Sequence, residues 1–285
     1  MSDPRHSSGL HDWLVPPEWA RIISDIKYRV TKRDSLRLLK QNREFQKLHS
    51  DRKRCFVIGN GPSLKTQDLK PLSNELVIVA NSFFQHPDHR HIAPKYYCVG
   101  DRQFIAGHSN SVAWLRELES ALPDTTLFVL PEARFTFAKH GLFKHHRVRH
   151  IDHVRVARNP EQVRIDLTLP LNVGYSTGTA FSIPLALYMG FREIYLIGFD
   201  ANWLADVNKG AIHFYETNKY FPHFDHTASE GAEMEMQLSS IQCEFASHRL
   251  LRDCAKLMGS QIFNATNGGW LDMYPRVRYE SLFNL

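Results

Sequence analysis

Short apolar runs alternate with longer helical patterns from Arg54 onward, and this alternation limits the fold more than any other feature of the chain. The runs expected to form strands are 55–58, 75–81, 95–99, 126–130, 193–197 and 261–265. The segments with helical patterns include 109–122, 175–189 and 234–257. Strands that alternate with helices predict a mainly parallel sheet with helices on both faces, the doubly wound α/β class of Rossmann-like folds.

The first fifty residues differ from the rest and are expected to form a basic helical N-terminal arm. A helical pattern begins at Pro17 and continues to about Leu48, with breaks near Thr31 and Asp34. Its basic residues are Lys27, Arg29, Lys32, Arg33, Arg37, Lys40 and Arg43, and its apolar residues include Trp19, Ile22, Ile23, Ile26, Tyr28, Leu36 and Leu39. We favour an arm over 1–50 that packs on a Rossmann-like domain over 51–285. The alternative is peripheral contact with anionic lipid headgroups or an anionic polymer.

Composition restricts the class of protein. A chain of 285 residues with 43% hydrophobic and 23% charged residues is ordinary for a globular protein. Its most apolar stretch, 180–199, contains Pro184, Arg192 and Glu193, and the N-terminus has no apolar signal core. The four cysteines lack metal-binding spacing, so a reduced, cytoplasmic protein is expected. The net charge of +5 suits anionic partners.

A glycine-bracketed turn follows the first expected strand. Its residues are Gly59, Asn60, Gly61, Pro62 and Ser63. Glycine permits positive φ and close approach of a ligand to the backbone, and proline suits the first position of a helix. Backbone N–H groups at a helix N-terminus bind anions, so the turn is expected to hold a phosphate. The alternative is an ordinary strand-to-helix connection.

Polar side chains lie at or shortly after the ends of most of the expected strands. They are Asn60, Asn81, Asp101, Asp200 and Asn264. Asn and Asp also favour turns for local reasons, so each one alone is ambiguous. Because ligands of doubly wound sheets bind beyond the carboxyl ends of the strands, the five together predict a site at that edge.

A second expected anion site lies at the start of the long helix near residue 179. Ser176, Thr177 and Gly178 precede that helix directly. Hydroxyl side chains at this position cap the helix, and the same groups with glycine can bind a phosphate. The two roles are compatible.

The segment 201–232 is long, rich in aromatic residues and histidines, and expected to form a lid. His213, His223 and His226 lie in it, and a histidine there could act as a general base. Five other histidines (His140, His145, His146, His150 and His153) are expected on the surface in a basic patch.

The sequence contains no HExxH, paired CxxC, P-loop or GxSxG motif, and Leu64 replaces the third glycine of GxGxxG. No metal ligands are predicted.

Several motifs together resemble known protein families. CFVIGNGPSL (55–64), STGTAF (176–181) and MGFREIYLIGFD (189–200) are similar to bacterial sialyltransferases of glycosyltransferase family 42. A wider group of surface-polysaccharide proteins, which shares a domain with archaeal 6-hydroxymethylpterin diphosphokinase, adds matches at 94–97, 213–214, 220–221, 264–269 and 275–280. The resemblance covers roughly residues 54 to 283.

This resemblance implies a glycosyltransferase A-like variant of the fold and a cytidine monophosphate (CMP) sugar as donor. The residues expected to bind the donor are Gly59, Asn60, Gly61, Pro62, Ser63, Asn81, Asp101, Ser176, Thr177, Gly178 and Trp203. The family's general base is a histidine after the Gly-x-Asp strand; His213 ranks first here and His226 second, with Asp200 as a further catalytic residue. The chain departs from the pattern because Thr177 separates Ser176 from Gly178 and Trp203 stands near the place of a tyrosine.

The leading hypothesis is a metal-independent, cofactor-free glycosyltransferase of capsule or lipopolysaccharide biosynthesis, which moves an acidic nonulosonate from a CMP-sugar to a glycan hydroxyl. Its expected partners are that donor and an anionic glycan or lipid-linked acceptor, with peripheral membrane contact through the arm and without nucleic acid. A homo-oligomer remains open. One rival is a Mg²⁺-dependent diphosphokinase that holds the metal between Asp101 and Asp200. The other is a nucleotide-binding module without catalysis.

Overall fold

The chain forms one seven-stranded parallel sheet with the strand order β5-β4-β3-β2-β1-β6-β7. The computed structural model describes residues 17–122, 124–154, 160–173, 179–202, 213–215 and 233–283. The strands are β1 (Arg54–Ile58), β2 (Val77–Ala80), β3 (Tyr96–Val99), β4 (Thr126–Val129), β5 (Val148–His150), β6 (Glu193–Ile197) and β7 (Gln261–Asn264). Strands β2, β3 and β4 are buried at every position, as expected for parallel strands covered on both faces.

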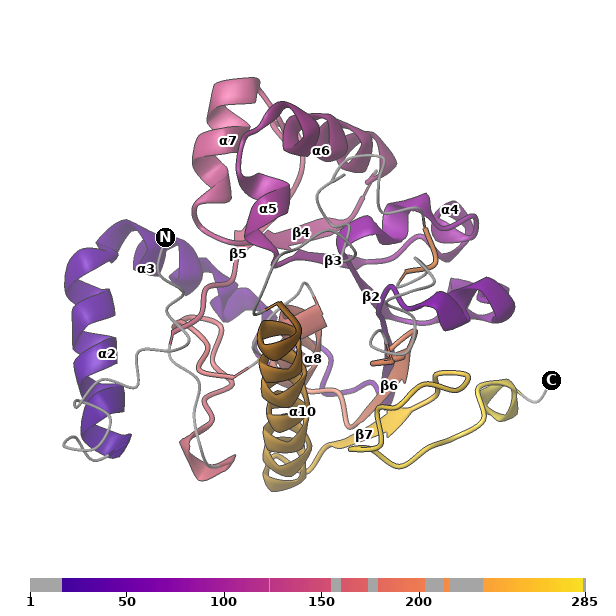
Figure 1. The fold of residues 1–285 in the computed structure, drawn as a ribbon. Coiled ribbons are helices and arrows are strands. Elements are labelled where there is room, and N and C mark those ends of the chain that lie inside the picture. The colour runs from indigo at the N-terminus through magenta and orange to yellow at the C-terminus, as the bar shows by residue number, and fades with distance from the viewer. Residues whose placement is uncertain are drawn as a thin grey trace.

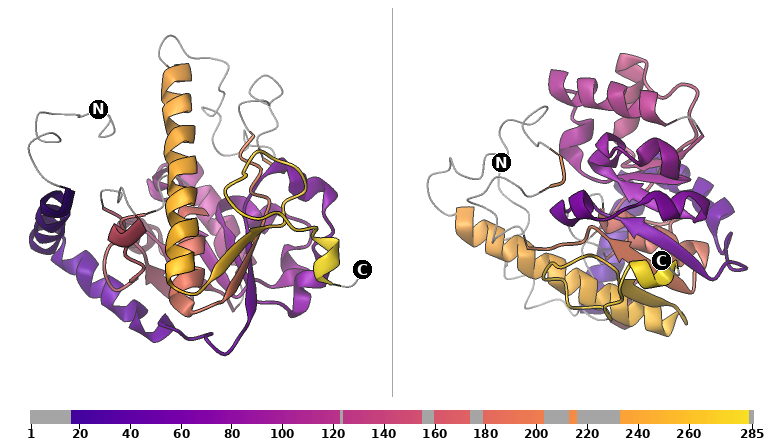
Figure 2. Two further views of the ribbon diagram at one scale, coloured as in Figure 1. Left: turned by 90° about the horizontal axis from the view of Figure 1, so that it is seen from below. Right: turned by 90° about the vertical axis from the view of Figure 1, so that its right-hand side faces the viewer.

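Helices cover both faces of the sheet, which confirms the doubly wound α/β class (Figure 1). The helices are α2 (Pro17–Thr31), α3 (Arg33–Lys40), α4 (His89–Ile92), α5 (Arg102–Ile105), α6 (Ser109–Ala121), α7 (Ala133–His140), α8 (Thr179–Met189) and α10 (Glu233–Leu257). Short 3₁₀ turns follow β1 and β2 instead of full helices. In both views of Figure 2, α10 extends as a long rod along one side of the sheet.

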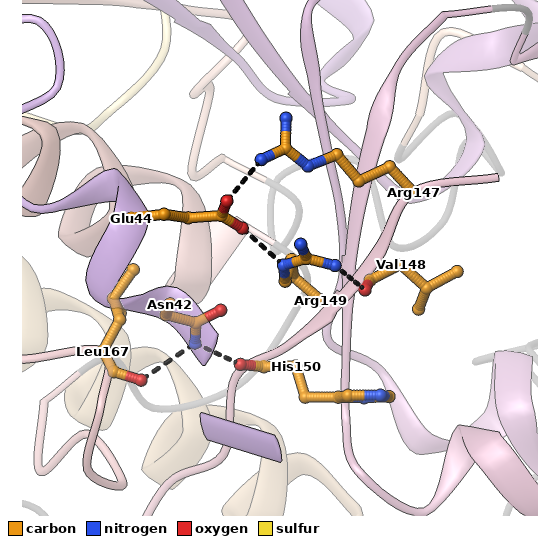
Figure 3. Close-up of polar contacts among 7 residues, drawn as sticks. All are labelled: Asn42, Glu44, Arg147, Val148, Arg149, His150 and Leu167. Atoms are coloured by element: carbon orange, nitrogen blue, oxygen red, sulfur yellow. Dashed lines mark hydrogen bonds and ion pairs between the residues drawn. The ribbon is translucent and has the colours of Figure 1, made fainter. Parts of the chain in front are cut away.

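The end of the arm packs on the edge strand β5 through the 3₁₀ turn η1 (Gln41–Phe45). Asn42 donates hydrogen bonds from Nδ2 to the carbonyl oxygens of His150 (2.6 Å) and Leu167 (2.9 Å), as Figure 3 shows. Glu44 accepts hydrogen bonds from Arg147 (2.6 Å) and Arg149 (2.7 Å). Phe45 is fully buried in the core. This part of the arm is therefore integral to the domain.

Strand β5 and helix α7 were missed by the sequence analysis. β5 has only three residues, and the arginines that flank and occupy it made the region look like a surface patch. Arg147 and Arg149 donate hydrogen bonds to Glu44. His150 is buried, so the prediction that it lies on the surface was wrong. Burial lowers the pKa of the His150 imidazole.

None of the helices in the described part of the chain is both long and apolar enough to cross a lipid bilayer.

Candidate functional site

The order of the strands places a topological switch point between β1 and β6. The chain moves outward from β1 to β5, then returns through α8 to β6 on the opposite side of β1. In doubly wound sheets, the crevice outside the carboxyl ends of the strands at such a point binds the ligand. The Gly59–Ser63 turn and Asp200 follow the two strands that flank this switch point.

The glycines of the turn allow it to approach the end of β6 closely. A Cβ atom at Gly61 would lie 1.7 Å from Oδ2 of Asp200, and one at Gly59 would lie 2.5 Å from the carbonyl oxygen of Gly198. Neither glycine has positive φ, and the backbone at Gly61 is extended, with φ of −66° and ψ of 158°. Both positions therefore need glycine because of steric contact with the protein itself.

Three N–H groups of this turn donate hydrogen bonds within the protein. Gly59 donates to the carbonyl oxygen of Ile197 (2.8 Å), Gly61 to that of Gly198 (2.9 Å), and Ser63 to Oδ1 of Asp200 (3.2 Å). The Ser63 hydroxyl also donates to Oδ2 of Asp200, at 2.8 Å. These contacts count against phosphate binding by the turn, because the anion at the N-terminal end of this 3₁₀ turn is the buried carboxylate of Asp200.

Two amide oxygens at the ends of β1 and β2 are buried and have no hydrogen-bond partner among the described residues. They are Oδ1 of Asn60 and Oδ1 of Asn81. The Nδ2 group of Asn60 donates to the carbonyl oxygen of Ala80 (2.9 Å), which fixes the orientation of that amide. Because a buried acceptor without a partner costs free energy, such oxygens suit a ligand that donates hydrogen bonds.

A short part of the expected lid lies over these strand ends. Phe214 donates its backbone N–H to the carbonyl oxygen of Asn60 (3.1 Å). Its ring makes edge contacts with the rings of Phe83 (6.2 Å between centroids) and His86 (5.2 Å). The ring of His213 stacks on that of Tyr215 at 4.9 Å. The structure therefore brings His213 to the same edge of the sheet as Asn60.

Tyr215 and Ser82 are site residues that the sequence analysis did not single out. Burial raises the pKa of the Tyr215 phenol to about 12, with a further increase from the charge of Asp101, although a hydrogen bond with Ser82 opposes the shift. The phenol therefore keeps its proton at neutral pH. Trp114 donates its indole N–H to the Ser82 hydroxyl (3.0 Å). The clue in the sequence was that Tyr215 lies two residues from His213.

Asp101 and Asp200 follow strands that are not neighbours in the sheet, whereas a shared magnesium site needs two carboxylates side by side. They follow β3 and β6, which are three strand positions apart, or roughly 14 Å at the usual spacing. Asp101 caps α5 by accepting the N–H (3.2 Å) and side-chain amide (2.9 Å) of Gln103. Burial raises the pKa of the Asp101 carboxyl. The two carboxylates thus have separate local partners.

Asn264 has a structural role at the end of β7. It is completely buried, donates from Nδ2 to the carbonyl oxygen of Leu271 (2.8 Å) and accepts the N–H of Thr266 (3.0 Å). Thr266 in turn accepts the N–H of Phe199 through its hydroxyl, at 3.0 Å. These contacts hold the loop after β7 against the end of β6.

The remaining residues predicted for the site lie outside the described residues. They are Ser176, Thr177, Gly178, Trp203, His223 and His226. Helix α8 begins at Thr179 and precedes β6, so its N-terminal end lies at the carboxyl edge of the parallel sheet.

One solved structure with a similar fold is the MAf glycosyltransferase from Magnetospirillum magneticum AMB-1, at a TM-score of 0.48 and 16% sequence identity. The similarity covers 87% of this chain and 39% of that protein, so the chain spans less than half of its length. No curated protein matches the chain. A family profile described as "6-hydroxymethylpterin diphosphokinase MptE-like" matches residues 33–206. This match confirms the suspected relationship, and the chain belongs to the MptE-like family.

Proposed function

We propose that this protein is a glycosyltransferase that binds a nucleotide-activated sugar at the switch point between β1 and β6. The observation that carries the proposal is a pair of buried amide oxygens, those of Asn60 and Asn81, at the ends of adjacent strands, which have no hydrogen-bond partner among the described residues. Sugar hydroxyls and the amino group of a nucleobase donate hydrogen bonds and match these acceptors. A phosphate does not match them, because it only accepts.

The donor is proposed to be a CMP-linked acidic sugar of the nonulosonate type, used for capsule or lipopolysaccharide synthesis. The support is the resemblance of the glycine turn and of the segment 176–181 to the family 42 sialyltransferases. Since Asp200 occupies the turn, we assign the phosphate of the donor to the N-terminal end of α8. Ser176, Thr177 and Gly178 would bind it there, helped by the dipole of the 11-residue helix.

A histidine is proposed as the general base for the hydroxyl of the acceptor. His213 is the first choice because its neighbour Phe214 is hydrogen-bonded to the end of β1, and His226 is the second. Transfer from a CMP-sugar needs a base and stabilisation of the departing phosphate, and both can come from protein groups without metal. Asp200 is proposed to act as a positioning residue that holds Ser63 and the turn.

The description of the MptE-like family favours a second function, transfer of diphosphate from ATP to a pterin-like alcohol. That reaction depends on Mg²⁺ bound to the nucleotide. The separate positions of Asp101 and Asp200 count against the two-carboxylate site that we had considered for it. A nucleotide-binding module without catalysis is the third reading, and it requires that replacing His213 and His226 leave function intact.

A nucleotide screen by thermal unfolding in EDTA tests the proposal. At a concentration 100 times its dissociation constant, a ligand stabilises a protein by about 2.7 kcal/mol, which shifts the melting temperature by several degrees. We expect CMP and CMP-sugars to produce this shift and ATP not to. A shift produced by ATP with Mg²⁺ and abolished by EDTA would support the diphosphokinase instead. No shift with any cytidine nucleotide would refute the proposal.

A further inference from the structure

Helix α2 carries a continuous apolar stripe that nothing in the described part of the chain covers. Its members are Trp19, Ile22, Ile23, Ile26 and Val30, which are 41% to 61% exposed. Their spacing of three, four, seven and eleven residues places them on one face of the helix. A single exposed isoleucine is ordinary, but a row of five large apolar side chains on one helix indicates an interaction surface.

The opposite face of α2 is attached to the domain by polar contacts. Tyr28 is buried and donates its hydroxyl hydrogen to Oδ2 of Asp152 (2.7 Å). Asp25 forms an ion pair with Arg164 (2.7 Å), and both side chains are largely buried. Burial and the charge of Asp152 raise the pKa of the Tyr28 phenol, so it remains a donor. These contacts hold the helix in place and turn its apolar stripe outward.

The stripe is flanked by positive charge. Lys27 and Arg29 are exposed and lie on either side of it around the helix, and Arg33 and Arg37 follow in exposed positions of α3. The segment 17–40 contains seven basic and three acidic side chains. An apolar stripe with basic side chains beside it complements a negatively charged surface that has an apolar interior.

Helix α2 also lies where it could reach a flat surface. It stands at the outer side of the molecule in Figure 1 and again in the left view of Figure 2. Its 15 residues extend over about 22 Å, and Trp19 near one end has the amphipathic ring that favours the boundary between headgroups and acyl chains.

We propose that α2 docks on an anionic lipid bilayer, with Trp19, Ile22, Ile23, Ile26 and Val30 inserted at the headgroup boundary and the flanking basic residues against lipid phosphates. The helix lies in the plane of the interface and does not span the bilayer. This docking is independent of the reaction proposed above.

Flotation with vesicles of phosphatidylcholine, with and without 30% phosphatidylglycerol, is a direct test. We expect binding to the anionic vesicles, little binding to the neutral ones, and weakening as salt rises, because lipid charges are screened. The double substitution Ile23→Glu/Ile26→Glu should reduce partitioning at least tenfold. Leu257→Glu is the control, since Leu257 is also exposed, at 67% against 54% for Ile23 and 56% for Ile26, but lies on α10.

A second readout excludes a trivial loss of folding. Both variants change exposed side chains, so their melting temperatures should stay within about 2 °C of the wild type, since surface substitutions cost little. The blue shift of tryptophan fluorescence on adding anionic vesicles should disappear in Trp19→Phe.

Three results would overturn the proposal. One is wild-type protein that does not float with the anionic vesicles at low salt, and another is equal loss of binding in Leu257→Glu. The third is a dimer in sedimentation that dissociates on Ile23→Glu/Ile26→Glu, because a second copy of the chain would then cover the stripe.

Discussion

The substitution Gly61→Ala tests whether contact with Asp200, and not backbone conformation, requires glycine in the turn. At φ of −66° and ψ of 158°, alanine is fully allowed. Replacing glycine by alanine at such a conformation normally stabilises a protein by about 0.4–1 kcal/mol through the unfolded state. The structure predicts the opposite sign.

The size of the effect follows from the contacts around Gly61. The new methyl group would lie 1.7 Å from Oδ2 and 2.6 Å from Cγ of Asp200, so this side chain must move. Its movement breaks the hydrogen bonds from the N–H and hydroxyl of Ser63. Hydrogen bonds to a charged group contribute about 1.5–3 kcal/mol each, so we expect the free energy of unfolding to fall by about 3–5 kcal/mol.

A double-mutant cycle separates this cause from general crowding. An Asp200→Ala background removes the two nearest atoms, whereas the carbonyl oxygen of Gly198, at 2.8 Å, still crowds the methyl group. The cost of Gly61→Ala should then drop to about 1–2 kcal/mol, which gives a coupling of about 1–4 kcal/mol. Gly259→Ala is the control, since no atom lies within 4 Å and only its φ of +74° adds strain. Urea unfolding measures the four proteins of the cycle and the control, and additive costs, or stabilisation by Gly61→Ala, would refute the reasoning.

Three further predictions concern other parts of the structure. Asn42→Ala removes two buried hydrogen bonds and should lower the free energy of unfolding by about 2–4 kcal/mol in urea; a loss below about 0.5 kcal/mol would contradict the role of η1. Burial lowers the pKa values of His89 and His248 to about 4 in the folded protein. As the pH falls, these histidines are therefore protonated in the unfolded chain before they are protonated in the folded one, and the free energy of unfolding should decrease from about pH 6.5 towards pH 4. His248→Gln should make the free energy of unfolding depend less on pH over this range, and an unchanged slope would contradict the role of His248. His213→Ala should reduce sugar transfer about 10²–10⁴-fold while CMP binding is kept; an unchanged rate would exclude it as the base.

The sequence predicted most of the sheet because the strands buried on both faces are nearly continuous apolar runs. Six of the seven strands were located this way, and their polar ends mark the carboxyl edge as expected. β5 was not predicted because its burial depends on partners in other segments. Glu44 accepts hydrogen bonds from Arg147 and Arg149, and Asn42 donates one to the backbone of His150. The local pattern of apolar and polar residues does not indicate such long-range contacts.

The sequence predicted that several polar residues and glycines follow the strands of one sheet edge, but not how they contact one another. Gly61 and Asp200 lie together beyond β1 and β6, and Asn60 and Asn81 follow the adjacent strands β1 and β2, since parallel strands end at one edge. The pairing of Asp200 with Ser63 could not be foreseen, because the two residues are 137 positions apart. A carboxylate and a phosphate satisfy the same N–H groups, so the motif alone could not tell which anion binds there.

The most direct test of the central claim is calorimetric titration of CMP, in EDTA, into the wild type and Asn60→Ala. Oδ1 of Asn60 has no partner in the described part of the chain; if it accepts a hydrogen bond from the ligand, the wild type should bind CMP and the variant should bind it about tenfold more weakly. Asn110→Ala, at an exposed position of α6, is the matched control and should bind like the wild type. Absence of CMP binding by the wild type, or equal affinities of the wild type and Asn60→Ala, would contradict the proposed site.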